Sequence, residues 1–195
     1  MNEETHKVLK RLERMAEKES LPSIGHVKGK VIADVIQDYK PGRILEIGTL
    51  YGYSAILMGS ILSQEQNEGK VTTIEIDKES ANIARKNIED AALDNKVEIL
   101  YGDALDIIPR LHDKFDMVFL DGTKEEYFKY LKLVEKYLEK GAVVVADNAG
   151  VFKTSMHDFL EYVRNSGLYN SRTLETELEF DSNTKDAIEI SIKIA

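Results

Sequence analysis

The stretch RILEIGTLYGYSAILMGSILS, residues 43–63, decides the fold. Its first six residues form a short apolar run that ends in glycine, which is typical of a buried strand. Residues 53–63 are apolar enough for a helix that packs on a sheet, and Gly48 and Gly52 indicate a tight turn between the two elements. A strand, a glycine turn and a helix in this order predict an α/β sheet.

The alternation of strand and helix continues along the chain. Further strands are expected at residues 70–76, 96–102, 116–121 and 142–147, with helices at 78–92, 104–111, 124–138 and 154–166. Two strands without a helix between them, at 166–175 and 186–194, suggest a hairpin. We therefore predict a mostly parallel seven-stranded sheet with one antiparallel strand and helices on both faces.

Two amphipathic helices precede this α/β pattern. Residues 3–18 carry an apolar face, and the chain then breaks at Pro22 and Gly25. A second helix follows, with its expected core face at Val27, Val31, Ile32, Val35 and Ile36. We predict a single domain over residues 1–195, in which residues 1–22 form a helical N-terminal extension.

Composition limits the class of protein. The 195 residues include no Cys, which excludes disulfides, Cys-ligated zinc and thiol nucleophiles within the sequence. The charged N-terminus does not read as a signal peptide, and no apolar run approaches the roughly 20 residues of a membrane span. We expect a cytoplasmic protein with no membrane partner, and a homodimer is compatible with the sequence.

The net charge of −9 disfavours nucleic acid as a partner but does not exclude it. Residues 1–30 carry 7 Lys and Arg against 5 Asp and Glu, so a local basic patch is compatible with the sequence.

Acidic side chains follow each of the five expected parallel strands. They are Glu46, Glu75, Asp103, Asp121, and Asp147 with its neighbour Asn148. In open α/β sheets, ligands bind at the carboxyl ends of the strands. A solvated loop explains one or two acids but not an acid at every strand end, so we expect the ligand site at this edge.

The glycine turn differs from the turn that binds dinucleotides. Gly48 and Gly52 do not complete the G-x-G-x-x-G pattern, and Glu46 places a negative charge where a diphosphate would lie. An acid there suits a ligand with a positively charged group, and Glu75 can accept hydrogen bonds from two ribose hydroxyls. We therefore expect S-adenosylmethionine as the cofactor rather than NAD.

The chain resembles the metal-dependent class I O-methyltransferases, the family of catechol O-methyltransferase and caffeoyl-CoA O-methyltransferase. The similar blocks are LEIGTLYGYSA, TIEID, GDALDIIPRL, DMVFLDGTKEEY and VVVADN. The resemblance begins near residue 23 and implies a Rossmann-like class I methyltransferase fold. It also implies methyl transfer to a hydroxyl of a small vicinal-diol or phenolic substrate. The catechol enzyme has a bulkier His-Trp pair where this chain has Gly122-Thr123.

The resemblance assigns roles to individual positions. The expected cofactor contacts are Ile24, Glu46, Gly48, Ser54, Glu75, Ile76, Asp103, Ala104 and Asp121. The expected metal ligands are Asp121, Asp147 and Asn148, and the expected catalytic residue is Lys124. A substrate-side acid corresponds to Glu175 or Glu177, and His26 lies in the loop on the cofactor side.

The implied ligands and the implied base make chemical sense together. Two carboxylates and an amide oxygen form a hard ligand set that suits Mg²⁺, or alternatively Ca²⁺ or Mn²⁺. Thr123 and Glu126 have the spacing of a capping box, which predicts that Lys124 begins a helix. A helix N-terminus and a nearby cation both disfavour an ammonium group, which favours a role as general base.

Three other functions stay open at this stage. One is methylation of a hydroxylated tRNA uridine, which the basic N-terminal segment favours and the overall acidity disfavours. Another is a cofactor-binding regulatory module, which would be expected to lack a ligand or the lysine. The third is an NAD-linked dehydrogenase, which the missing third glycine and Glu46 disfavour.

Overall fold

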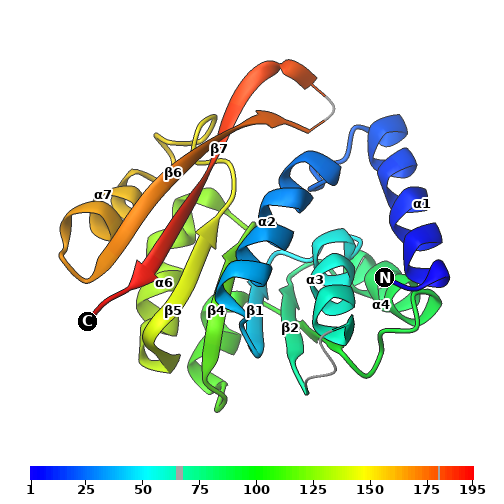
Figure 1. Ribbon diagram of the computed structural model, residues 1–195, viewed down its shortest axis with the longest axis horizontal. Coiled ribbons are helices and arrows are strands. Elements are labelled where there is room, and N and C mark those ends of the chain that lie inside the picture. The colour runs from blue at the N-terminus through cyan, green and yellow to red at the C-terminus, as the bar shows by residue number, and fades with distance from the viewer. Residues whose placement is uncertain (65–67, 180) are drawn as a thin grey trace.

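A seven-stranded sheet forms the centre of the protein in the computed structural model, which describes residues 1–64, 68–179 and 181–195 (Figure 1). The strands are β1 Arg43–Ile47, β2 Lys70–Glu75, β3 Val97–Tyr101, β4 Phe115–Leu120, β5 Leu138–Ala146, β6 Tyr169–Leu178 and β7 Asp181–Lys193. Their order is β3-β2-β1-β4-β5-β7-β6. β7 runs antiparallel to both of its neighbours, while the pairs among β1 to β5 are parallel. The predicted sheet is confirmed.

Helices cover both faces of the sheet. One face is covered by α1 Glu3–Glu19, α2 His26–Tyr39, α3 Tyr53–Gln64 and α4 Lys78–Asp90. The other is covered by α5 Ala104–Ile107, α6 Tyr127–Val134 and α7 His157–Asn165, with short 3₁₀ turns η1 Ile108–Arg110, η2 Lys124–Glu126 and η3 Glu135–Tyr137. None of the helices in the described parts of the chain is long and apolar enough to span a bilayer.

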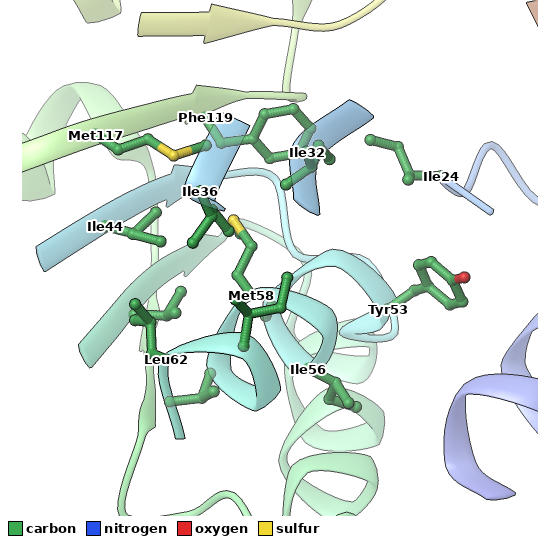
Figure 2. Packing of buried hydrophobic residues seen from close by; sticks show 14 of the residues in the cluster. Ile24, Ile32, Ile36, Ile44, Tyr53, Ile56, Met58, Leu62, Met117 and Phe119 are labelled. Carbon is green, nitrogen blue, oxygen red and sulfur yellow. The ribbon is translucent and has the colours of Figure 1, made fainter. Parts of the chain in front are cut away.

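The central strands are apolar on both faces because helices bury both of them. On β1, Ile44 packs in the cluster below α2 and α3, whereas Leu45 and Ile47 pack in the cluster below α6 and α7. Figure 2 shows the first cluster, where side chains from α2 and α3 meet those of β1 and β4: Ile32, Ile36, Met58, Ile44, Met117 and Phe119.

The core face of α2 differs from the predicted one. Ile32, Val35 and Ile36 are buried as expected, but Val27 and Val31 are only half-buried. Lys28 takes the buried position instead, with 2% of its surface exposed. Residue 28 lies one turn before Ile32 on the same helix face, so its ammonium group is carried into the protein interior.

The expected helix at residues 124–138 is wrong as a single element. It divides into η2, α6 and η3, and β5 begins directly afterwards at Leu138. The predicted capping box is also absent, since the Thr123 side chain does not cap the turn. Instead, the hydroxyl of Tyr130 donates to Glu126 Oε2 over 2.7 Å, which directs this carboxylate toward α6.

Candidate active site

The carboxyl ends of β1, β2, β4 and β5 open into one cavity of about 800 Å³. The loop between α1 and α2 and the end of β6 complete its wall. The predicted site residues that line it are Ile24, Gly48, Ser54, Glu75, Ile76, Asp103, Ala104, Asp121, Lys124, Asp147 and Asn148. A smaller hollow of about 470 Å³ beside β3 contains none of them.

The glycine turn after β1 is held tightly against the end of β4. Gly48 has a φ of +98°, and a Cβ there would lie 2.5 Å from the backbone oxygen of Asp121. Glu75 fixes the same turn, because its Oε2 accepts from the backbone N–H groups of Thr49 (3.0 Å) and Leu50 (2.8 Å). Its Oε1 accepts from the N–H of Asp77 at 2.8 Å. The Glu75 carboxylate is therefore already oriented at the cavity wall.

Ile76 and Asp103 bound the far end of the cavity. Ile76 exposes 67% of its surface, which is unusual for a large apolar side chain, and a flat ligand such as adenine would cover it. Asp103 caps α5 by accepting from the N–H of Leu105 at 2.8 Å, which places Ala104 at the cavity wall.

Among the expected cofactor contacts, metal ligands and base, Glu46 alone does not line the cavity and lies behind its wall. It is fully buried; Thr73 donates to its Oε2, while its Oε1 has no hydrogen-bond partner among the residues that the structure describes. Burial raises the pKa of Glu46 to about 8; the Ser54 and Thr73 hydroxyls oppose this shift, while the charges of Asp121 and Glu75 add to it. A positively charged ligand group near this carboxylate would offset both the cost of burying its charge and the repulsion from Asp121 and Glu75.

The buried Glu46 should make the ligand-free protein less stable as pH rises. The pKa of about 8 in the folded state exceeds the ordinary value of 4.5, so the folded state holds a proton that the unfolded state releases. The free energy of unfolding should therefore fall as the pH rises from 4.5 to about 8, by at most about 1.4 kcal/mol per pH unit. Thermal unfolding of the wild type and Glu46→Gln at pH 5.5 and 8.5 checks it. The variant should gain stability relative to the wild type at the higher pH, and an unchanged difference would contradict the assignment.

Asp121, Asp147 and Asn148 come together because β4 and β5 are adjacent. The backbone N–H of Asp147 donates to the carbonyl of Leu120 at 3.0 Å, which aligns the two strand ends. Asn148 adopts a left-handed conformation with φ of +61°, so the regular strand alternation stops there. This conformation allows neighbouring side chains to reach one point, and Asn tolerates it better than most residues.

The electrostatics of this trio fit a bound cation. Burial raises the pKa of Asp147, and the charge of Asp121 raises it further, although Lys28 opposes both effects. A divalent cation would offset the repulsion between the two carboxylates. In the described residues, no group of three or more His, Cys, Asp or Glu side chains could hold a metal ion. The candidate ligand set therefore depends on the amide oxygen of Asn148.

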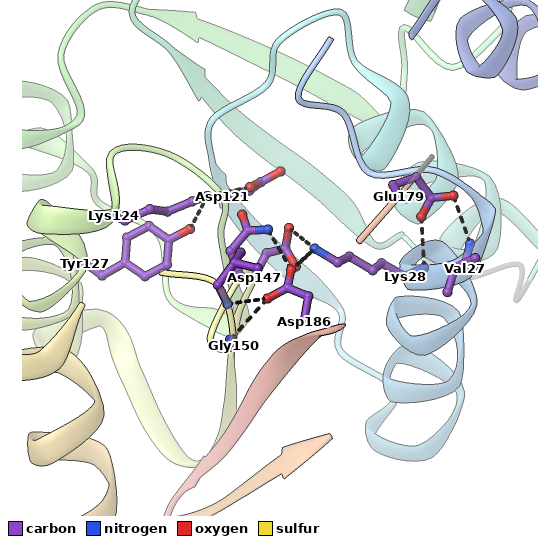
Figure 3. Close-up of polar contacts among 11 residues, drawn as sticks. Val27, Lys28, Asp121, Lys124, Tyr127, Asp147, Gly150, Glu179 and Asp186 are labelled. Atoms are coloured by element: carbon purple, nitrogen blue, oxygen red, sulfur yellow. Dashed lines mark hydrogen bonds and ion pairs between the residues drawn. The ribbon is translucent and has the colours of Figure 1, made fainter. Parts of the chain in front are cut away.

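Lys28 and Asp186 lie beside these candidate ligands, and neither was identified from the sequence (Figure 3). Lys28 Nζ lies 2.8 Å from Asp147 Oδ1 and 2.6 Å from Asp186 Oδ2. Burial opposes the charge of Lys28, but the two carboxylates outweigh it and raise the pKa of Lys28. A lysine on the apolar face of α2, one turn before Ile32, is the signal that could have revealed the pair.

Lys124 is fixed at the same end of the cavity. Its Nζ lies 2.9 Å from Asp121 Oδ1 and donates to Tyr127 Oη over 2.8 Å (Figure 3). Lys124 begins a helix as expected, but this helix is the short 3₁₀ turn η2, and α6 starts only at Tyr127. Burial raises the pKa of Tyr127 well above its usual value, so this phenol stays neutral beside the lysine.

Glu179, and neither of the two acids expected at the substrate side, lines the cavity. Glu175 and Glu177 are exposed on β6 and do not line the cavity, whereas Glu179 does. Glu179 also accepts from the backbone N–H of Val27 at 3.4 Å, at the N-terminus of α2. His26 lies 3.4 Å from Glu179 but is largely exposed and outside the cavity wall.

Comparisons with known proteins agree with this geometry. A model of the O-methyltransferase family matches residues 1–164. Catechol O-methyltransferase of Mus musculus is 37% identical over 172 residues, which cover 85% of this chain and 63% of that protein. The Sus scrofa enzyme is 34% identical, with 90% of this chain and 95% of that protein covered. The chain thus spans less than two thirds of the mouse relative's length but nearly all of the pig relative's.

Solved structures show the same fold. The O-methyltransferase from Bacillus cereus in complex with SAH has a TM-score of 0.84 at 26% identity, covering 99% of this chain and 91% of that one. The O-methyltransferase TomG from Streptomyces achromogenes, in complex with SAM, has a TM-score of 0.84 at 25% identity, covering 100% and 91%. Together with the family match over most of its length, these likenesses establish that the chain belongs to the O-methyltransferase family.

Proposed function

We propose that the protein is an S-adenosylmethionine-dependent, Mg²⁺-dependent O-methyltransferase that acts on a hydroxyl of a small vicinal-diol or phenolic substrate. The observation that carries the proposal is the shared cavity. Residues assigned to the cofactor, such as Glu75 and Ile76, line one end of it, and Asp121, Asp147 and Lys124 line the other. A donor and an acceptor bound in one enclosed space can meet in line.

The cofactor, when bound, would supply the methyl group as a sulfonium. Glu75 would accept hydrogen bonds from the ribose hydroxyls, because three backbone N–H groups already hold its carboxylate at the wall. Gly48 and Ser54 would face the methionine end. Ile76 would cover the adenine, which gives its exposed apolar side chain a partner.

At the other end, Asp121, Asp147 and Asn148 would hold the divalent cation, which would supply Lewis-acid activation of the acceptor hydroxyl. Lys124, as the neutral amine, would accept the hydroxyl proton at its Nζ, which lies 2.9 Å from Asp121 and therefore beside the proposed cation. Tyr127 would hold the amine in place through the 2.8 Å hydrogen bond.

The walls beside Lys124 favour a flat acceptor with polar edges. Phe152 and Leu178 contribute apolar surface, and Glu179 contributes a carboxylate. Gly122 and Thr123 also line the cavity and have small side chains, which would leave room for a ring with substituents. An aromatic vicinal diol would meet the apolar walls with its ring and the cation with its oxygens.

A methyl-transfer screen with labelled S-adenosylmethionine tests this function. Catechols, flavonoids, acyl-CoA phenols and tRNA would be the acceptors, with Mg²⁺ present. Label on a small phenol or diol is the expected result, while label on tRNA alone would favour the tRNA enzyme. Cofactor binding without transfer to any acceptor would favour a regulatory module, and tight NAD binding would contradict the cofactor assignment.

A further inference from the structure

We propose that Asp186 is a positioning residue, which sets the orientation of the Asn148 amide for the metal and is tied to Asp147 through Lys28. This inference rests on the proposed metal site. It adds two residues, Asp186 and Lys28, that lie outside the assigned ligand set of Asp121, Asp147 and Asn148.

An asparagine ligand needs its amide oriented. The side chain of Asn148 carries one oxygen, which can bind a cation, and one NH₂ group, which cannot. Asp186 Oδ2 accepts a hydrogen bond from Asn148 Nδ2 at 2.9 Å. Because an ionised carboxylate only accepts hydrogen bonds, it selects the nitrogen and leaves the amide oxygen for the cation.

The second oxygen of Asp186 holds the backbone that follows Asn148. Asp186 Oδ1 accepts from the N–H groups of Gly150 at 3.1 Å and Val151 at 3.0 Å. This turn lies close against β7, since a Cβ on Gly150 would lie 2.8 Å from the Asp186 backbone. These bonds fix the turn in which Asn148 keeps its left-handed conformation.

Lys28 couples this carboxylate to Asp147, the candidate ligand that directly follows β5. Its ammonium lies 2.6 Å from Asp186 Oδ2 and 2.8 Å from Asp147 Oδ1, with all three side chains buried (Figure 3). Lys28 pairs with both carboxylates, so it links the position of the Asp147 side chain to that of Asp186. Buried ion pairs are weak evidence for stability, which leaves positioning as the role that the geometry favours.

The substitution Asp186→Asn tests the proposal. One amide cannot accept from both Asn148 and the backbone N–H groups of Gly150 and Val151, so one set of bonds is lost. Mn²⁺ affinity, measured by titration calorimetry without substrate, should fall about 10–100-fold, as is usual when an outer partner of a metal ligand is removed. Affinity for S-adenosylhomocysteine should stay within about twofold of wild type, since Asp186 lies outside the assigned cofactor contacts.

A matched control and a rescue separate positioning from general stability. Glu189→Gln changes a fully buried carboxylate on the same strand, which pairs with Arg164 (2.8 Å) away from the cavity, and should leave Mn²⁺ affinity unchanged. The double variant Asn148→Asp, Asp186→Asn restores a donor and an acceptor between the two positions and keeps the total charge. It should bind Mn²⁺ within about tenfold of wild type, which a purely structural role does not predict.

The outcomes distinguish this inference from the proposed function. Wild type that binds no Mn²⁺ overturns the metal site itself, and the inference with it. Wild type that binds Mn²⁺ while Asp186→Asn binds equally well overturns only the positioning role. If Asp186→Asn does not fold, the double variant decides, and Mn²⁺ binding more than about tenfold weaker than wild type overturns the proposal.

Discussion

Removal of divalent cations by EDTA is expected to abolish methyl transfer, and added Mg²⁺ is expected to restore it. A phenolic hydroxyl has an ordinary pKa near ~10, so only about one molecule in a thousand is ionised at pH 7. Without a cation beside Asp121 and Asp147, the rate should therefore fall by roughly 10³-fold. Initial rates in EDTA, and after titration with Mg²⁺, measure this directly.

A control locates the loss at the proposed site. Asp147→Asn removes one ligand charge with little change in shape, and its rate should resemble that of wild type in EDTA. Binding of S-adenosylhomocysteine should persist in both cases, because the expected ribose contact, Glu75, lies at the end of β2, which β1 and β4 separate from β5 in the sheet. Full activity in EDTA would contradict the assignment of Asp121, Asp147 and Asn148 as ligands of a metal that catalysis needs.

The sheet could be predicted because its signals are local. Buried strands such as β1 and β5 read as short apolar runs, and Gly48 and Gly52 indicated the turn that follows β1. The antiparallel β7 followed from the lack of a helix between the last two strands. Because parallel strands share one carboxyl edge, the residues that follow them could be expected to meet there.

The predictions that were wrong or missing concern contacts that the local sequence pattern does not determine. Lys28 is 119 residues from Asp147 and 158 from Asp186 in the chain, so no local pattern joins them. The predicted capping box at Thr123 does not form, because the Tyr130 hydroxyl bonds the Glu126 carboxylate instead. Glu46 could be placed at a strand end, but its position behind the cavity wall depends on how β1 packs between its neighbours.

The single domain, the homodimer and the cytoplasmic location stay predictions. The assigned roles of Glu46, Asp103 and the other site residues also stay predictions until variants are measured. The identity of the methyl acceptor also stays a prediction, and it rests on the cavity walls formed by Phe152, Leu178 and Glu179.

Replacement of Lys124 by alanine is expected to lower kcat by roughly 10²–10⁴-fold, the contribution typical of a positioned general base. Nζ of Lys124 lies against Asp121 and Tyr127 at the acceptor end of the cavity, so it can reach the hydroxyl proton. Affinity for the cofactor should hardly change, because Lys124 is not among the assigned cofactor contacts. Single-turnover rates and cofactor titrations of the variant separate these two effects.

Lys124→Arg decides between a base and a fixed positive charge. A guanidinium group keeps its proton throughout the accessible pH range, so it can replace the charge of the lysine but cannot accept a proton. If Lys124 is the base, the Arg variant should be nearly as slow as Lys124→Ala. Tyr127→Phe serves as the matched control, since it removes the 2.8 Å hydrogen bond but keeps the amine, and should cause a smaller loss. An Arg variant with near wild-type kcat would mean that the side chain only supplies charge, and proton transfer to Lys124 would have to be abandoned.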